Sequence, residues 1–212
     1  MNSPVVEAHR LTYSTPTGRV LQKDLNFSIS AGQMLLVTGS NGCGKSSLLR
    51  TLLGETTHYW GHVCVNVESD KQVYLPQLEN TEVHLPLTLL DVLRISQPET
   101  VSREAAKQFG LLRDEHLGAA WNSASGGERK RTLLTRALLQ NPSLMVFDEP
   151  MNHLDRSSRA AMVDVMAHFL TSGPDRAIVM VCHQGLKDDE RSKFNIVPLD
   201  LDAQRGGWGA TC

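Results

Sequence analysis

Apolar residues lie along the chain in short runs separated by polar turns. Residues 34–38, 144–147 and 177–182 are apolar almost throughout, which is typical of strands buried on both faces of a sheet. Residues 46–53 instead carry leucines at helical spacing, and residues 157–170 have an amphipathic helical pattern. Buried strands that alternate with helices predict an α/β fold with a parallel sheet.

The remaining pattern predicts two further parts. Residues 5–13 and 20–29 each suit a strand, with a turn between them at residues 15–18, and strand-like segments return at residues 62–67 and 72–75. From residue 87 to residue 139, apolar residues recur at intervals of three and four. The start of the chain is therefore expected to be rich in strands, and the middle to be a helical insertion.

Composition restricts the class of protein without identifying it. The chain has 212 residues, 41% of them hydrophobic and 21% charged, as in an ordinary soluble domain. The net charge of −2 shows no basic surplus, so no nucleic-acid partner is expected. No apolar run approaches the roughly 20 residues of a membrane-spanning helix, and the N-terminus lacks a signal-peptide pattern. The four cysteines show no paired or metal-binding spacing, which predicts reduced thiols in a cytosol.

A glycine-rich loop is the first candidate site. It reads Gly39-Ser40-Asn41-Gly42-Cys43-Gly44-Lys45-Ser46, fits the pattern G-x-x-x-x-G-K-[ST], and lies between a predicted strand and a predicted helix. The glycines let backbone N–H groups surround phosphate oxygens, Lys45 would reach the β- and γ-phosphates, and Ser46 would ligate Mg²⁺. Ser47 is included in the phosphate site, whereas Cys43 occupies a variable position with no catalytic role. The loop predicts a P-loop NTPase, a class that includes kinases, GTPases, helicases and transport ATPases.

Two carboxylates end the strand at residues 144–147. The carboxyl ends of parallel strands meet at one edge of the sheet, where the glycine-rich loop is also expected. Asp148 suits the acid that holds Mg²⁺, and Glu149 would then polarise the water that attacks the γ-phosphate.

A third motif distinguishes among P-loop families. The segment at residues 123–131 contains Ser125-Gly126-Gly127-Glu128 and resembles the signature sequence of ABC ATPases, with Ala124 in place of the usual leucine. Ser125 followed by the helical pattern of residues 128–139 predicts a capped helix start.

Other markers of the same family occur in order. Tyr13 matches the adenine-stacking aromatic residue, Gln77 the Q-loop, and His183 the switch histidine that contacts the γ-phosphate. Asp155 ends a D-loop of residues 152–155 and could either act across a dimer interface or cap the helix that follows. The chain is therefore identified as similar to ABC ATPases over almost its whole length.

This resemblance implies a fold and a composite site. The implied fold has a P-loop NTPase (RecA-like) core with a parallel sheet at residues 1–78 and 137–212, an N-terminal antiparallel β subdomain, and a helical signature subdomain at residues 79–136. The implied cofactors are ATP and Mg²⁺, with Ser46, Gln77 and Asp148 as metal ligands. Each ATP would lie between the phosphate loop of one subunit and Ser125, Gly126 and Gly127 of a second copy.

Two functions remain open at this stage. The first is the ATP-hydrolysing subunit of a transporter, bound to separate permease subunits on the inner face of the cell membrane. Residues 85–93 follow the Q-loop, where such subunits receive coupling helices, and together with residues 74–77 they look similar to bacterial zinc and manganese importer cassettes. The second is a soluble ABC ATPase that acts on ribosomes or DNA, which the D-loop Asn152-His153-Leu154-Asp155 favours. A single cassette without a long charged linker favours transport.

Overall fold

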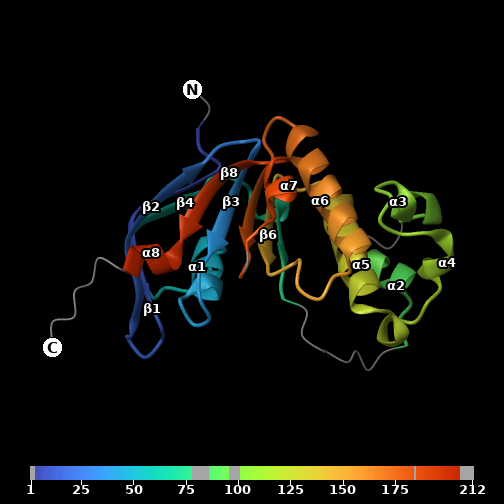
Figure 1. Ribbon diagram of the computed structural model, residues 1–212, viewed down its shortest axis with the longest axis horizontal. Coiled ribbons are helices and arrows are strands. Elements are labelled where there is room, and N and C mark those ends of the chain that lie inside the picture. Colours follow the sequence, from blue (N-terminus) through green and yellow to red (C-terminus); the bar gives the residue numbers. More distant parts are fainter. Residues whose placement is uncertain (1–2, 78–85, 96–100, 184, 206–212) are drawn as a thin grey trace.

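The structure is a computed structural model that describes residues 3–77, 86–95, 101–183 and 185–205 of the chain. It contains two sheets and a group of helices, arranged side by side in Figure 1. The predicted α/β class, with a parallel sheet, an antiparallel sheet and helices, is confirmed. Within the described ranges, no helix is both long enough and apolar enough to cross a membrane.

The main sheet is parallel and is buried on both faces. Its strands are β3 (Gln33–Thr38), β5 (Gln72–Leu75), β6 (Leu144–Asp148), β7 (Ala177–Val181) and β8 (Asn195–Asp200), in the order β5-β6-β7-β3-β8. Alternate side chains enter two different cores: Leu36 packs in the core that contains the helical group, and Leu35 in the core beneath the second sheet. The wholly apolar strand runs in the sequence follow from this double burial.

The second sheet is antiparallel, and it has one face on a core and one face toward solvent. It consists of β1 (Val6–Ser14), β2 (Val20–Ile29) and β4 (Tyr59–Val65), in the order β2-β1-β4. Its inner face packs in the same core as helix α1 (Lys45–Leu52), which follows β3 and the glycine-rich loop.

Helices form the other side of the molecule. They are α2 (Leu89–Arg94), α3 (Arg103–Lys107), α4 (Asp114–Leu117), α5 (Gly126–Leu139) and α6 (Arg156–Thr171), with a 3₁₀ turn η2 (Trp121–Ser123) before α5. Figure 1 shows α2, α3 and α4 beyond α5 and α6, on the far side of the main sheet from α1. The subdomain boundary expected at residues 136–137 lies inside α5, so one continuous helix connects the two parts.

The apolar residues after the Q-loop are mostly part of the core. Leu89, Leu90, Val92 and Leu93 are all buried, whereas Ile95 at the end of α2 is exposed. The leucine pattern of residues 85–93 therefore builds the helical core more than a contact surface, and Leu85 itself lies outside the described residues.

Strand β8 was not predicted from the sequence. It carries Pro198 and is only partly buried, so it lacks the apolar run that identifies the central strands. Proline is tolerated there because β8 is at the edge of the sheet. After the short helix α7 (Asp188–Arg191), β8 returns the chain to β3, and α8 (Leu201–Arg205) then reaches the glycine-rich loop. A further 3₁₀ turn, η1 (Ser69–Lys71), leads into β5.

Candidate nucleotide-binding site

The glycine-rich loop has a backbone that other residues could not adopt easily. Gly39, Gly42 and Gly44 have φ angles of +147°, +73° and +106°. A Cβ atom at Gly44 would lie 3.0 Å from Cε2 of Tyr13, and one at Gly39 would lie 2.7 Å from Sγ of Cys43. The Cys43 side chain is fully buried and packs against Gly39. The loop leads directly into the N-terminus of α1, which presents unpaired N–H groups and the positive end of the helix dipole.

Lys45 and Ser46 connect this loop to β6. The Lys45 ammonium donates to the carbonyl oxygens of Gly39 (2.8 Å) and Ser40 (2.9 Å), which holds it across the loop. The Ser46 hydroxyl donates to Oδ2 of Asp148 at 3.0 Å, although the two residues are 102 positions apart. Asp148 is 6% exposed; burial raises the pKa of its carboxyl group, and the Ser46 hydrogen bond works in the opposite direction. A hydroxyl and a carboxylate side by side are oxygen ligands of the kind that Mg²⁺ takes.

Glu149 lies at the next position, in a constrained turn. Its φ is +51°, which is unusual for a residue with a side chain, and its N–H donates to the Val181 carbonyl at 3.1 Å. The Asn152 amide donates to the Glu149 carboxylate, and the Lys130 ammonium donates to the Asn152 carbonyl. Burial lowers the pKa of Lys130, and the negative charge of Glu149 partly opposes this effect. Sequence reasoning missed Lys130 and the contact from Asn152.

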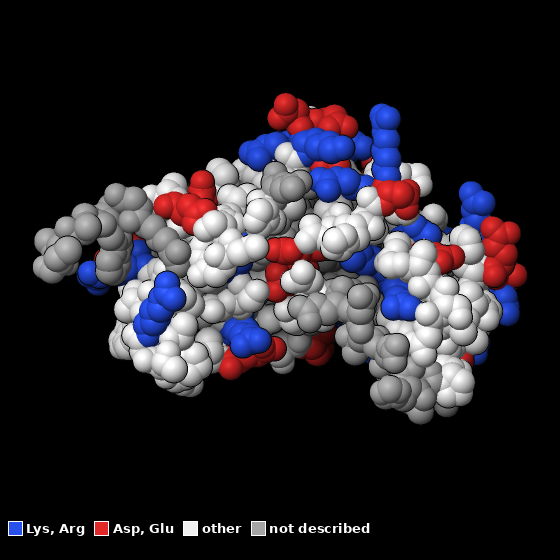
Figure 2. Space-filling view, turned by 60° about the horizontal axis from the view of Figure 1, so that its bottom comes forward, with Lys and Arg blue, Asp and Glu red and all other residues white. Residues whose placement is uncertain are grey.

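Gln77 and His183 lie at the same edge of the sheet. Gln77 comes two residues after Leu75, which pairs with Phe147, so it is level with Glu149. His183 comes two residues after Val181, which pairs with Asp148, and both Gln77 and His183 are exposed. In Figure 2, which brings this edge forward, acidic side chains lie in the middle of the molecule between two bulging parts.

The signature segment starts a helix as predicted. The Glu128 N–H donates to Oγ of Ser125 (3.2 Å), and the Ser125 N–H donates to the Glu128 carboxylate (2.8 Å), which together form a capping box. Gly127 packs close to the start of α6, where Asp155 accepts from the Ser158 N–H at 2.9 Å. Hydrogen bonds from the Ser157 and Ser158 hydroxyls hold the pKa of Asp155 well below its usual range. Asp155 therefore caps α6, which is one of the two roles considered for it from the sequence.

The signature segment and the phosphate loop are separated within one chain. Figure 1 shows α1 and α5 on opposite sides of β6, so the amides that begin α5 do not face the loop that precedes α1. Ser125 and Gly126 are exposed, which leaves them accessible to a second molecule.

Tyr13, the residue predicted to stack on adenine, is buried beneath the phosphate loop. Its side chain is 1% exposed, and its hydroxyl donates to the Gly44 carbonyl at 3.1 Å, so the ring packs beneath the loop. In this structure the ring therefore supports the loop, and its role in stacking on adenine stays a prediction. Next to Tyr13, an open hollow lies between the end of β1 and α1; it is lined by residues that include Ser14, Pro16, Ser47 and Arg50.

Two residues that support the loop were not predicted. The buried Gln22 amide donates to the carbonyls of Cys43 and Leu201, each at 3.0 Å. The Asp202 carboxylate accepts from the Ser40 N–H (2.6 Å) and the Ser40 hydroxyl (2.9 Å). These contacts join the strand β2 and the helix α8 to the loop, and no local sequence pattern indicates pairs so far apart.

Comparison with known proteins gives a consistent set of relatives. The family model described as ABC transporter matches residues 22–152. The chain is 36% identical over 169 residues to the zinc import ATP-binding protein ZnuC of Acinetobacter baylyi, covering 78% of this chain and 62% of that protein. ZnuC of Magnetococcus marinus is 34% identical, and the match covers 70% of this chain and 57% of that protein. The chain therefore spans about six tenths of the length of these two relatives. A metal transport system ATP-binding protein of Thermotoga maritima is 32% identical, covering 84% of this chain and 75% of that protein.

Solved structures share the fold. A metal-chelate type ABC transporter in an inward-facing conformation matches with a TM-score of 0.71 and 23% identity, covering 85% of this chain and 74% of that one. CbiO1 of Clostridium perfringens, part of the ABC transporter complex cbiONQ, matches with a TM-score of 0.74 and 16% identity, covering 94% and 86%.

The position of Tyr13 can be tested by its contribution to stability. We expect Tyr13→Ala to lower the free energy of unfolding by about 3–5 kcal/mol, the cost of removing a large buried aromatic side chain. Urea unfolding followed by circular dichroism measures this change. Trp60→Ala is the matched control, because Trp60 is 59% exposed on β4 and its loss should cost about 0.5 kcal/mol or less. Equal small effects in the two variants would show that Tyr13 is a surface residue.

Proposed function

Because the chain belongs to the ABC transporter family, we propose that it binds and hydrolyses ATP as the motor subunit of a membrane transporter. The observation that carries this proposal is the 3.0 Å contact between Ser46 and Asp148, with Lys45 held across the adjoining loop. This contact unites the two motifs that a P-loop NTPase needs for phosphate and metal binding.

Phosphate binding would exchange contacts that already exist in the loop. Lys45 donates to two loop carbonyls, and these hydrogen bonds would be replaced by bonds to the β- and γ-phosphate oxygens. The remaining charge would be balanced by backbone N–H groups of residues 39–47 and by the dipole of α1. The hollow beside Ser47 and Arg50 offers space for the base end of the nucleotide.

The metal site fits the residues that are present. Ser46 and Asp148 provide adjacent oxygen ligands, and Gln77 lies at the same strand edge. Mg²⁺ bound there would neutralise charge on the phosphates. It would also offset the cost of keeping the Asp148 carboxylate buried.

Hydrolysis would depend on Glu149. Its carboxylate would accept a hydrogen bond from the attacking water and polarise it toward the γ-phosphate, giving ADP and inorganic phosphate. The Asn152 amide orients this carboxylate, and the β6–β7 pairing holds its backbone. His183, at the end of the neighbouring strand, would contact the γ-phosphate.

A second copy of the chain would complete each site. The signature segment at the start of α5 lies away from the phosphate loop of its own chain, with Ser125 exposed. An N-terminus of a 14-residue helix can stabilise an anion, and in a dimer it would face the γ-phosphate of the partner. Closure on ATP would then drive permease subunits at the inner face of the cell membrane.

The relatives favour a metal-ion importer over a soluble ATPase. The curated proteins reported above are named for zinc import and metal transport, and one of them covers 84% of this chain. We infer a divalent metal ion or a metal chelate as the transported substrate, and no nucleic-acid partner.

Replacement of Glu149 tests the hydrolytic step. Glu149→Gln should lower ATP turnover by at least about 100-fold, since it removes the acceptor that polarises water. ATP-dependent dimerisation should persist, because the amide keeps the size of the carboxyl group. Phosphate release and size-exclusion chromatography with light scattering measure the two properties. Glu115→Gln, on the exposed surface, should change neither. Normal turnover in Glu149→Gln would remove this residue from the mechanism.

Replacement of Ser125 tests the composite site. Ser125→Arg should abolish cooperative hydrolysis and ATP-dependent dimerisation, because a long cation would block closure onto the second subunit. Binding of a fluorescent ATP analogue to the single chain should be unchanged. Ser125→Ala, which loses the helix cap without adding bulk, separates a loss of stability of about 1 kcal/mol from a loss of closure. Hydrolysis at the original rate by Ser125→Arg would contradict the composite site.

Membrane partners distinguish transport from the soluble alternative. The tagged chain, purified from detergent-solubilised membranes with ATP withheld, should copurify with integral membrane subunits in a fixed ratio. An untagged culture treated in the same way controls for nonspecific retention. Recovery of ribosomal proteins in their place would overturn the transport function and support the soluble one.

A further inference from the structure

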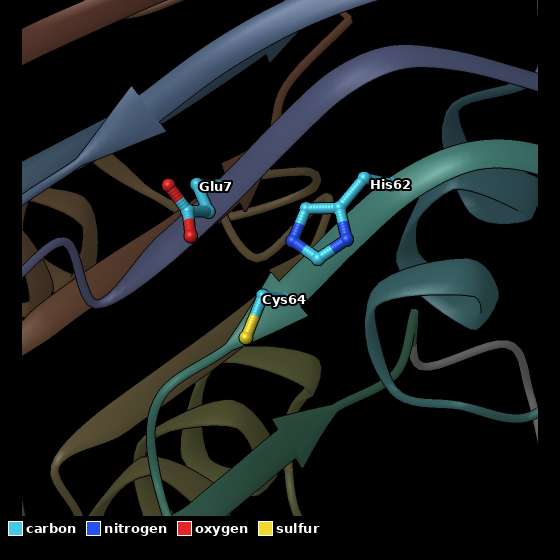
Figure 3. A group of neighbouring side chains, drawn as sticks. All are labelled: Glu7, His62 and Cys64. Atoms are coloured by element: carbon cyan, nitrogen blue, oxygen red, sulfur yellow. The ribbon is translucent and has the colours of Figure 1, made fainter.

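The outer face of the antiparallel sheet carries a group of metal-binding side chains. Glu7 and His9 lie two residues apart on β1, and His62 and Cys64 lie two residues apart on β4, so each pair faces the same side of its strand. The pairing register places Glu7 opposite Cys64 and His9 opposite His62. Figure 3 shows Glu7, His62 and Cys64 gathered between these two strands.

The ligand atoms of this group are close together. One carboxylate oxygen of Glu7, a ring nitrogen of His62 and Sγ of Cys64 all lie within 4.8 Å of one another. Around a tetrahedral zinc ion, with bonds of about 2.0–2.3 Å, neighbouring ligand atoms are roughly 3.3–3.8 Å apart. The separation can therefore be closed by rotation of side chains, since His62 is exposed and Glu7 and Cys64 are only half-buried.

His9 supplies further support for the group. Its Nε2 lies 3.4 Å from Oε2 of Glu7, and its ring stacks on the His62 ring with centroids 6.2 Å apart. It can orient the Glu7 carboxylate or take the fourth ligand position, which is otherwise left to water.

We propose that Glu7, His62 and Cys64, assisted by His9, bind one zinc-type divalent cation. One thiolate, one imidazole and one carboxylate suit Zn²⁺ or Co²⁺, whereas Mg²⁺ and Ca²⁺ require a set of oxygen ligands. The Cys64 thiol donates to Oδ1 of Asn66 at 3.0 Å. Binding releases this proton to solvent and replaces the S–H bond with a sulfur–metal bond, with no change in oxidation state.

The bound ion would join the edge strand β4 to the central strand β1. β4 lies at the edge of its sheet and is paired on one side only, so a metal crosslink to β1 stabilises the folded chain over the unfolded one. The ligands point away from the core that contains α1, and none belongs to the candidate nucleotide site. The metal site is therefore independent of the proposed function, and either can fail without the other.

Cobalt spectroscopy and zinc titration test this site. In the full chain carrying Cys212→Ser, one equivalent of Co²⁺ should produce a thiolate-to-cobalt absorption band that one equivalent of Zn²⁺ displaces. Cys43 and Cys182 are buried, which leaves Cys64 as the accessible thiol among the cysteines that the structure describes. Zn²⁺ should also raise the Tm of this protein.

Variants of the proposed ligand residues show whether these side chains bind the metal ion. Cys64→Ser should abolish it, His62→Ala and Glu7→Gln should each weaken zinc binding by at least about 100-fold, and His9→Ala by about 10-fold. His168→Ala, which removes an exposed histidine on α6, is the matched control and should bind zinc normally. Nucleotide binding should be the same in all of these variants. A band that persists in Cys64→Ser, or zinc affinity that is unchanged in both His62→Ala and Glu7→Gln, would overturn the site.

Discussion

Apolar side chains cover both faces of the main sheet, and this burial leaves the strand ends as the places where polar groups can gather. β3, β6 and β7 alternate their side chains between two cores. A charged side chain at one of their central positions would therefore be buried, which costs free energy. All three strands run in the same direction, and the residues after them emerge at one edge. Lys45, Asp148, Glu149 and His183 lie near this edge because Asp148 ends a strand and the other three come after one.

Because the strand ends lie next to the buried sheet, the candidate site raises the free energy of the folded chain when no ligand is bound. Asp148 is a carboxylate that is almost completely buried, and its raised pKa reflects the cost of its charge there. Glu149 occupies a left-handed backbone conformation, which costs of order 1 kcal/mol or more. Hydrogen bonds from Ser46 and Asn152 offset part of these costs. Groups kept in such positions would gain most from a bound cation and phosphates, which is the physical reason for proposing them as site residues.

Local motifs predicted the local structure around the candidate site, because the residues of each motif lie in one short segment and can be recognised by their spacing alone. The glycine-rich loop, the acidic end of β6 and the capped start of α5 all lie within single segments, and the structure has the local conformations predicted for them. Residues that act through distant contacts were missed. Asp202 reaches Ser40 across 162 positions, and Gln22 reaches Leu201 across 179, so no local pattern could reveal either contact.

Tyr13 and Cys64 show a second limit of sequence reasoning in β strands. A strand position faces a core or solvent according to register, and the irregular pairing between Ala8 and Leu11 changes which positions of β1 face inward, so that Tyr13 is buried. Cys64 has only one other proposed ligand, His62, in its own segment, since Glu7 is on another strand. A motif can show that residues form one site only when they are near each other in sequence. When they lie on different strands, the pairing of the strands determines whether they meet.

The two faces of β1 have separate consequences for the phosphate loop. On the inner face, Tyr13 packs against Gly44 and accounts for the glycine there, because a Cβ atom would meet the ring at 3.0 Å. On the outer face, Glu7 and His9 join β1 to β4. A change in the pairing of β1 with β4 would shift Tyr13 as well, since a strand moves as one element and Tyr13 itself pairs with Tyr59 of β4. The position of the loop in front of α1 therefore depends on the antiparallel sheet as well as on the parallel sheet whose strand ends carry the candidate site.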